Sequence, residues 1–322
     1  MINPYLHKFL NLLPYDERTK FRDLSAIKSE DRSAKSKILN FYSSVDNIGN
    51  FTPVMGIHQI LGEDLDTWCA HDKNIDWDFI NKNYERIIVG GAGLYHVSFT
   101  NFWKELNEKS NIPFIIWGVG GIFPKAKDML SNVDGKLLSA VHDKADLINV
   151  RDDISANLIN TTNVDIAPCP TIYLLNSLRN KKVENNNILY SSHEELLNAE
   201  DKKVVERFLG AKDKYLFTDN IQYKYYGLDR VLNKYYKSNH VITTRLHGAI
   251  IAYGLGIPYT AISFDYKIEE FNRLYGNGTI INDIRDMSDS VMDYQKVNNN
   301  EVVPDLSGIN RFAEKVKLWI KD

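Results

Sequence analysis

Short apolar segments that each end in a turn and lead into a helix-like segment recur through most of this chain. The clearest are IIVGG (87–91), FIIWGVGG (114–121) and YTAISF (259–264), and the series begins at Lys37. Apolar strands that alternate with helices form parallel sheets, and helices cover both faces of such sheets. The alternation therefore predicts an α/β fold built on parallel sheets.

The alternation falls into two parts. Residues 175–187 are polar and rich in asparagine, and we interpret them as a linker. A chain of 322 residues is also too long for one ordinary hydrophobic core. We therefore predict two Rossmann-like domains that face a cleft, over residues 1–178 and 179–322, and an amphipathic C-terminal helix from Ser307 to Lys321.

Composition argues against several classes of protein. The formal net charge of −3 gives no indication of a nucleic-acid partner. The two cysteines, Cys69 and Cys169, make neither a disulfide framework nor a zinc site, and we expect no metal. The chain shows no secretory signal and no run of about 20 apolar residues, which favours a cytoplasmic location.

The first 36 residues allow two interpretations. Apolar residues recur at near-helical spacing between Ile2 and Leu13, and dense charge of both signs follows from Asp16 to Lys37. We interpret this stretch as a solvated helix or loop on the surface. The alternative is an amphipathic contact with a partner or with a membrane, at the inner face of the cell membrane.

One long segment carries most of the functional information: VITTRLHGAIIAYGLGIPYTAISFDYK (241–267). Its first strand ends at Arg245 and His247, beside the start of a helix, and a helix N-terminus favours anions. Parallel strands end on the same rim of a sheet, so Lys267, after the next strand, can join them. A guanidinium, an ammonium and an imidazole on one rim suit a small polyanion.

Each of these residues also has a purely structural explanation. Arg245 could form an ion pair with Asp265 at the edge of the core. His247 could cap a backbone carbonyl, and Lys267 could be a solvated surface lysine. The three together favour an anion site more strongly than any one of them alone.

The same segment resembles the polysaccharide pyruvyl transferases. That family has a strand ending in Arg-Leu-His-Gly, an apolar helix, Gly-x-Pro, and a strand ending in an aromatic-Asp-x-Lys signature, and residues 244–271 follow this order throughout. Shorter pieces extend the resemblance over residues 37–285: NIGN (47–50), IIVGGAG (87–93), WGVGG (117–121), VRDDIS (150–155) and APCPTIYLL (167–175). The chain departs from the family at Asn50, Ala92 and Cys169, which bears on the acceptor more than on the donor.

The resemblance implies an enzyme that moves a pyruvyl group from phosphoenolpyruvate to a pair of sugar hydroxyls as a cyclic ketal. The acceptor would belong to a surface polysaccharide, such as a capsule or exopolysaccharide, or to its precursor, with a lipid-linked form among the options. Phosphoenolpyruvate is then the donor substrate, and no cofactor is implied. The sequence gives no prediction of the oligomeric state.

The resemblance also assigns roles to particular residues. His247 would be the acid/base residue, which suits a side chain that titrates near neutrality. Arg151, Arg245 and Lys267 would bind the donor's phosphate and carboxylate, with Leu246 in the same set and with Asp265 and Gly248 in support. The candidates on the acceptor side are Asn47, Gly49, Gly91, Gly93 and His96, and His193 is a further titratable candidate near a strand end.

Two other functions remain open from the sequence. A nucleotide-sugar glycosyltransferase would share the same glycosyltransferase-B-like layout and would also use cations and a helix N-terminus. A noncatalytic polysaccharide-binding or assembly protein derived from the enzyme fold is the third hypothesis. The spacing of twenty residues from His247 to Lys267 favours the pyruvyl transferase over the glycosyltransferase. The intact Arg-Leu-His with lysine argues against the noncatalytic protein.

Overall fold

The structure is a computed structural model, and it describes residues 33–44, 46–125, 131–159, 161, 163–183, 187–193, 197–210, 215–223, 226–287 and 303–322. The predicted surface helix or loop at the start of the chain lies outside these residues, apart from its last few positions.

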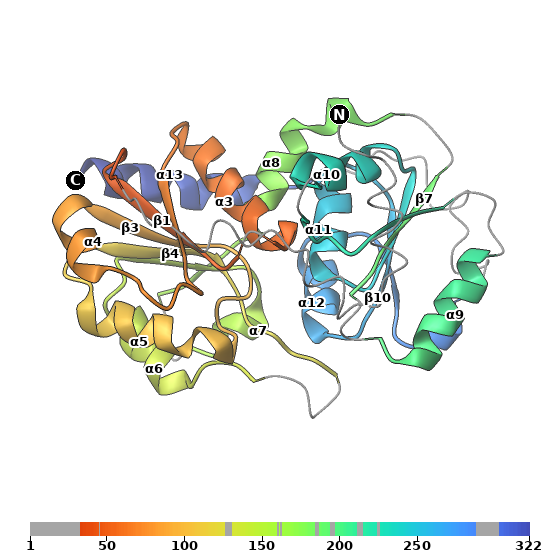
Figure 1. Ribbon diagram of the computed structural model, residues 1–322, viewed down its shortest axis with the longest axis horizontal. Coiled ribbons are helices and arrows are strands. Elements are labelled where there is room, and N and C mark those ends of the chain that lie inside the picture. Colours follow the sequence, from red (N-terminus) through yellow and green to blue (C-terminus); the bar gives the residue numbers. More distant parts are fainter. Residues whose placement is uncertain are drawn as a thin grey trace.

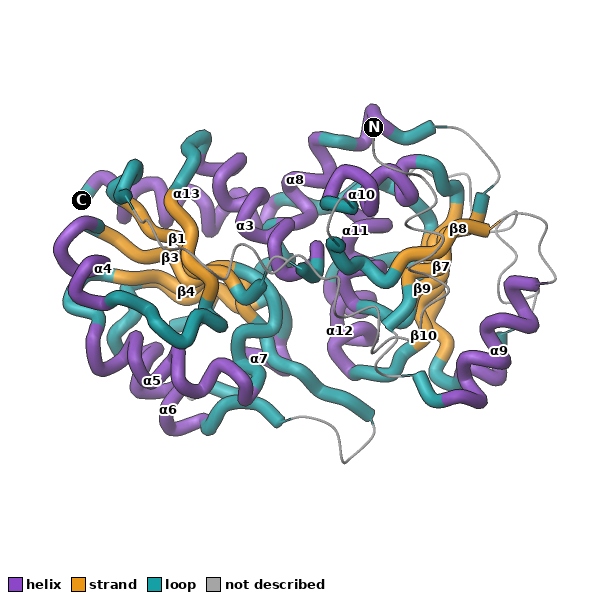
Figure 2. The backbone as a smooth tube through the Cα atoms, viewed as in Figure 1, coloured by secondary structure: helices purple, strands orange, loops and turns teal. Residues whose placement is uncertain are grey.

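Two parallel sheets form the centre of the molecule (Figure 2). The first has the order β2-β1-β3-β4-β5-β6, and the second has the order β11-β10-β9-β7-β8. The strands of the first sheet are β1 (Ile38–Tyr42), β2 (Asp66–Cys69), β3 (Arg86–Gly90), β4 (Phe114–Val119), β5 (Leu147–Val150) and β6 (Asp165–Ile166). Those of the second are β7 (Ile188–Ser191), β8 (Tyr215–Thr218), β9 (His240–Thr243), β10 (Tyr259–Ile262) and β11 (Thr279–Ile281).

Every neighbouring pair of these strands is parallel, which confirms the predicted fold class. The sequence does not predict β2 and β11. Each is the last strand at one edge of its sheet and is only four or three residues long, so neither carries a clear apolar run.

Helices follow most strands and cover both faces of each sheet (Figure 1). The helices associated with the first sheet are α3 (Ile48–Leu61), α4 (Trp77–Asn83), the 3₁₀ turn η2 (Val97–Phe99), α5 (Thr100–Lys109), α6 (Gly135–His142), α7 (Asp153–Ala156) and α8 (Thr171–Ser177). Those that follow in the chain are η3 (Arg179–Lys181), α9 (Ala199–Gly210), α10 (Leu228–Tyr236), α11 (Leu246–Gly254), α12 (Tyr266–Leu274) and η4 (Ile284–Asp286), and the last helix, α13 (Ser307–Lys321), packs on the first sheet again.

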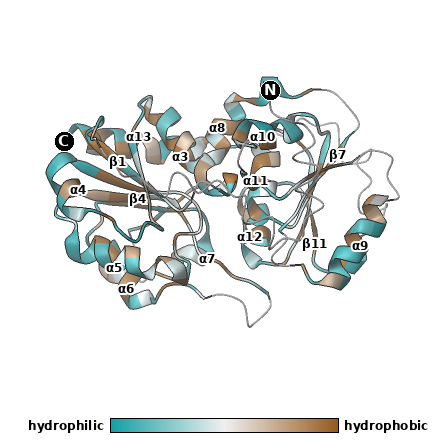
Figure 3. Cartoon of the chain, in the orientation of Figure 1, coloured by the Kyte–Doolittle hydropathy of each residue, from teal (hydrophilic) through white to brown (hydrophobic). Residues whose placement is uncertain are grey.

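The hydrophobic core has three main layers. Helices α4, α5 and α6 bury apolar side chains against one face of the first sheet, and α9 does the same on the outer face of the second. Between the two sheets lies a single larger cluster, formed by α3, α8, α13 and the helices α10 to α12. Figure 3 shows largely brown, apolar strands between helices that carry both teal and brown residues, which is the pattern expected of sheets buried on both faces.

Helix α8 joins the two halves and overlaps the predicted linker. It lies between α3 and α11, where Thr52 Oγ1 is 2.9 Å from Thr171 Oγ1 and a Cβ on Gly254 would lie 2.9 Å from Leu175. The interpretation of residues 175–187 as linker is therefore wrong for its first three residues, which form the last turn of α8. Apolar Ile172 and Leu175 are fully buried there because both halves pack on the helix.

The last helix returns to the first half of the chain (Figure 1). It begins and ends where the sequence predicts, at Ser307 and Lys321. Trp319 Nε1 donates to Asp146 at 2.7 Å, and Lys315 pairs with Asp165 at the end of the first sheet. This helix belongs to the predicted second domain by its position in the chain, but these contacts are with the first sheet. In the part of the chain described, no helix combines the length and the apolar character needed to cross a membrane.

Candidate active site

A cleft of about 320 Å³ lies where the carboxyl ends of strands from the two sheets meet. This is the position at which open α/β sheets bind ligands. The first half contributes Ser43, Asn47, Asn50, His71, Gly93, His96, Ser98, Phe99, Ile122 and Arg151, and the second half contributes His193, Arg245, Leu246, His247 and Lys267. Both the predicted donor residues and several predicted acceptor residues therefore line one cavity.

Arg151 stands directly after β5 and is almost fully buried. Its Nε donates to Asp152 at 3.2 Å, and one terminal nitrogen donates to the carbonyl of Gly121 at 2.8 Å. Asp152 is held in turn by the backbone N–H of Ser155, at the start of α7. A Cβ on Gly120 would lie only 2.3 Å from Arg151 Nε, so the guanidinium packs directly against the backbone there.

Arg245 is the residue that precedes α11, and it is also 5% exposed. Its Nε donates to the carbonyl of Ser192 at 2.6 Å, which ties the end of β9 to the end of β7. Gly248, one turn later, does not line the cleft. A side chain there would meet Thr243 Oγ1 at 2.0 Å, so the glycine lets α11 begin close behind the strand.

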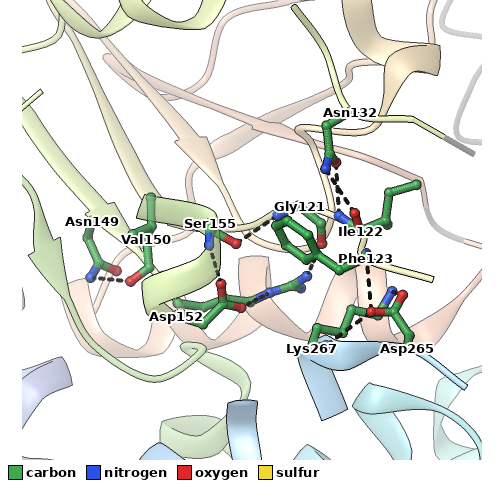
Figure 4. Close-up of polar contacts among 11 residues, drawn as sticks. Gly121, Ile122, Phe123, Asn132, Asn149, Val150, Asp152, Ser155, Asp265 and Lys267 are labelled. Carbon is green, nitrogen blue, oxygen red and sulfur yellow. Dashed lines mark hydrogen bonds and ion pairs between the residues drawn. The ribbon is translucent and has the colours of Figure 1, made fainter. Parts of the chain in front are cut away.

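Lys267 reaches the cleft from the first turn of α12, and Asp265 fixes it (Figure 4). The Lys267 ammonium is 2.8 Å from one oxygen of Asp265. The other oxygen accepts the backbone N–H of Lys267 at 3.0 Å and that of Phe123, from the first half of the chain, at 3.2 Å. Burial lowers the pKa of Lys267, while the carboxylate of Asp265 acts in the opposite direction.

His247 lies among these three cations. Burial, followed by the charges of Arg151, Lys267 and Arg245, holds the pKa of His247 well below its ordinary value. The imidazole is therefore neutral at neutral pH. Its Nε2 atom is buried and makes no hydrogen bond with any described residue. A buried polar atom without a partner is uncommon in folded proteins and suggests that a ligand supplies the missing hydrogen bond.

Helix α3 brings the first half of the chain against His247. Asn47 caps this helix by accepting the backbone N–H of Gly49 at 3.0 Å. A Cβ on Gly49 would lie 2.3–2.6 Å from Cγ, Cβ and Nδ1 of His247, so the imidazole lies directly on the backbone of the first turn. Gly49 therefore supports His247 and does not itself line the cleft.

The predicted glycine turn after β3 has a mixed outcome. Gly93 lines the cleft, but Gly91 does not: it adopts a φ of +84° and packs against Pro53. Ala92 keeps a φ of +67°, a conformation that costs an L-residue roughly 1–2 kcal/mol. The chain therefore keeps the glycine-type backbone at a position where the family has glycine.

His96 faces the cleft from the start of η2. Its Nδ1 accepts the backbone N–H of Ser98 at 3.1 Å, so the proton of the neutral ring belongs on Nε2. That Nε2 atom is buried and has no hydrogen-bond partner among the described residues. Burial, together with the charge of Lys267, lowers the pKa of His96, which makes the ring a neutral donor at physiological pH.

The structure adds His71 to the sequence-based site and places the candidate His193 in the same cleft. His71 follows the unpredicted strand β2, and its exposed ring lies on Phe99 with 4.1 Å between the ring centroids. His193 joins the cleft after β7, where its backbone N–H donates to Thr244 Oγ1 at 2.6 Å. Only a search for residues that follow each strand could have found His71, and its strand has no clear sequence signal.

The residues described hold no cluster of three histidine, cysteine, aspartate or glutamate side chains arranged to bind a metal ion. The site is instead a set of cations around neutral imidazoles. Residues 19–266, more than half of the chain, match the family described as polysaccharide pyruvyl transferase. The chain belongs to this family. The family match includes Arg151, Arg245 and His247 and ends one residue before Lys267.

Solved structures resemble this member of the family in fold. UDP-GlcNAc 2-epimerase from Methanocaldococcus jannaschii is 10% identical, with a TM-score of 0.55 over 88% of this chain and 100% of that chain. MnaA from S. aureus, solved with UDP, is 13% identical, with a TM-score of 0.55 over 89% of this chain and 97% of that chain. No curated protein matches the chain in sequence.

Identities this low show the fold alone. They agree with two Rossmann-like halves in the glycosyltransferase-B-like arrangement, as the sequence predicts. A shared fold does not carry a shared reaction, so the function must be argued from the cleft.

Proposed function

We propose that the protein transfers the pyruvyl group of phosphoenolpyruvate to two hydroxyls of a polysaccharide-type sugar, which become bridged as a cyclic ketal. The observation that carries this proposal is the convergence of Arg151, Arg245 and Lys267 on one neutral histidine, in a chain of the pyruvyl transferase family.

The cations suit the donor's two anionic groups. Phosphoenolpyruvate carries a phosphate and a carboxylate on the same carbon atom, C2, and arginine binds both kinds of group through paired N–H donors. The guanidinium groups of Arg151 and Arg245 each donate a hydrogen bond to a backbone carbonyl. These bonds orient both groups before the donor arrives. Lys267 adds a compact charge that Asp265 keeps in place.

His247 fits the proton transfers of the reaction. Protonation of the donor's CH₂ group makes C2 electrophilic, and a sugar hydroxyl oxygen then bonds to C2. The second hydroxyl forms the other C2–O bond as the C2–O bond to phosphate breaks. The two hydroxyls lose one proton each. One proton is equivalent to the proton taken up when CH₂ becomes CH₃, and the other leaves with phosphate.

The charge state of His247 should change as the donor binds. Before the donor binds, three cations favour the neutral imidazole, which can accept a proton from a sugar hydroxyl. The donor's negative charges offset those cations and raise the pKa, because a nearby opposite charge favours the protonated ring. The same Nε2 atom can then deliver a proton to the donor. The cations also stabilise the departing phosphate.

The first half of the chain would hold the acceptor. His96 presents a neutral N–H donor, while Asn47 and Asn50 supply amides on the same side of the cleft. Hydroxyl-rich sugars need such neutral donors and acceptors, whereas the cations of the second half and Arg151 suit the donor.

Phosphate release from phosphoenolpyruvate tests the proposal. Galactosides, mannosides and N-acetylhexosamines serve as acceptors, and UDP-sugars are offered separately as donors. We expect acceptor-dependent release, and His247→Ala should lower turnover by at least about 100-fold, the usual scale of acid/base assistance. Far-UV circular dichroism of the variant checks that it is folded. Turnover of a UDP-sugar with no use of phosphoenolpyruvate would instead indicate a glycosyltransferase.

A further inference from the structure

A second cavity of about 600 Å³ adjoins the cleft on the first half of the molecule. It lies between the segment that follows β2 and the outer side of α5. His71 and Ser98 line both cavities, so the two are neighbours on either side of these side chains. We call the second cavity the side groove. None of the residues assigned to the donor lines it.

The side groove has an apolar part and an aromatic part. Ala70, Ile75 and Phe102 line it and are buried. His71 also lines it, is exposed, and its ring contacts Phe99 with 4.1 Å between the centroids. Sugars bind to such surfaces because the C–H face of a pyranose packs on apolar and aromatic groups.

The walls of the side groove are polar and electrically balanced. Asn101, Lys104 and Glu108 project from one side of α5 and are exposed. Across all the lining residues, three lysines (Lys73, Lys104, Lys109) face three carboxylates (Asp72, Glu105, Glu108). This balance contrasts with the cationic cleft. A polyanion gains little from such a wall, whereas uncharged hydroxyls can pair with both the donors and the acceptors.

We propose that the side groove binds the sugars that adjoin the modified residue of a neutral oligosaccharide acceptor. The modified sugar lies in the cleft, its neighbour lies on His71, and the next sugar lies between α5 and the segment after β2. A cavity of this size is within the range of ordinary small-molecule sites. The assignment rests on the proposed pyruvyl transfer for the identity of the acceptor, but it does not require the donor for binding.

Binding to immobilised neutral oligosaccharides of two to four sugars tests the inference without any turnover. The groove variant replaces Asn101, Lys104 and Glu108 with alanine, and the matched control replaces Asn310, Arg311 and Glu314, which are exposed on α13. Both sets remove one asparagine, one base and one acid from a helix surface, and alanine preserves helix formation. We expect the wild type and the control to bind the same glycans. The groove variant should bind them at least about 10-fold more weakly, the scale of one or two lost hydrogen bonds.

The outcomes separate this inference from the proposed reaction. Wild-type protein that binds no neutral oligosaccharide, or a groove variant that binds like the control, would overturn the side groove as a glycan site. Exclusive binding of anionic glycans would overturn the neutral class. A failure to use phosphoenolpyruvate in the phosphate-release assay would reject the pyruvyl transfer and leave the result of the binding measurement unaffected.

Discussion

At the scale of single residues, the contact between Gly49 and His247 joins the two halves of the site. The imidazole lies on the first turn of α3 because position 49 has no side chain. The sequence places Gly49 among acceptor candidates through its glycine turn. The structure gives it a different task, which is to leave room for the ring of the proposed acid/base residue.

Replacing Gly49 with alanine should displace His247 while the protein stays folded. The new methyl group would lie within 2.6 Å of three ring or side-chain atoms, so the imidazole must move. A displacement of about 1 Å near the reacting atoms can lower turnover about 100-fold, which is the loss we expect in the phosphate-release assay.

Gly227→Ala is the matched control, since a Cβ there would meet its nearest neighbour at an ordinary 3.6 Å. Equal activity of Gly49→Ala and Gly227→Ala would contradict the contact. Thermal unfolding of both variants shows whether either substitution acts through stability instead.

Sequence reasoning found the cations because they follow strands that are easy to recognise. Arg245, His247 and Lys267 come after apolar, β-branched segments whose parallel ends must share a rim. The same reasoning could not find His71, because β2 is short, contains Asp66 and lies at the sheet edge. It also selected Gly91 and Gly248, which act in backbone packing behind the cleft.

At the scale of secondary-structure elements, α12 positions its own functional residue. Asp265 caps the helix, pairs with the Lys267 ammonium and accepts a backbone N–H from Phe123 of the first half. One carboxylate thus fixes a helix, a cation and a contact between the halves (Figure 4). The sequence predicted that Asp265 supports a neighbouring cation, but the partner from residue 123 lies 142 positions away and has no local signal.

Asp265→Asn should shift the pH dependence of donor binding. Burial already lowers the pKa of Lys267 and the Asp265 carboxylate opposes this, so the amide variant lowers that pKa further. Lys267 then loses its charge at a lower pH. The KM for phosphoenolpyruvate should begin to rise about one pH unit earlier on the alkaline side, with little penalty at acidic pH.

Steady-state kinetics from neutral to alkaline pH check this shift, because a lysine with a lowered pKa loses its charge on the alkaline side. Glu269→Gln, on the same helix but paired with Lys125 at 2.5 Å, is the control and should leave the profile unchanged. An Asp265→Asn profile that superimposes on the wild type would contradict the role of the pair.

At the scale of the whole molecule, the cleft depends on how the two sheets are joined. The sequence predicts two Rossmann-like domains that face a cleft, and one hydrophobic cluster runs from α3 and α13 through α8 into α10, α11 and α12. Backbone hydrogen bonds also join the halves. The Ile48 N–H donates to the carbonyl of Asn220 at 2.9 Å, and the Lys125 N–H donates to the carbonyl of Phe264 at 3.0 Å. Long-range packing of this kind cannot be inferred from local periodicity, which describes one element at a time.

Residues from both halves are proposed to bind phosphoenolpyruvate together, and calorimetric titration with the donor measures this binding without turnover. Arg151→Ala removes a cation of the first half, Lys267→Ala removes one of the second, and Arg273→Ala removes an exposed arginine outside the cleft. We predict saturable binding to the wild type and to Arg273→Ala. Each of the other variants should bind at least about 10-fold more weakly, as expected for a lost charge-assisted hydrogen bond. No binding to the wild type, or unchanged affinity in both cleft variants, would contradict the account.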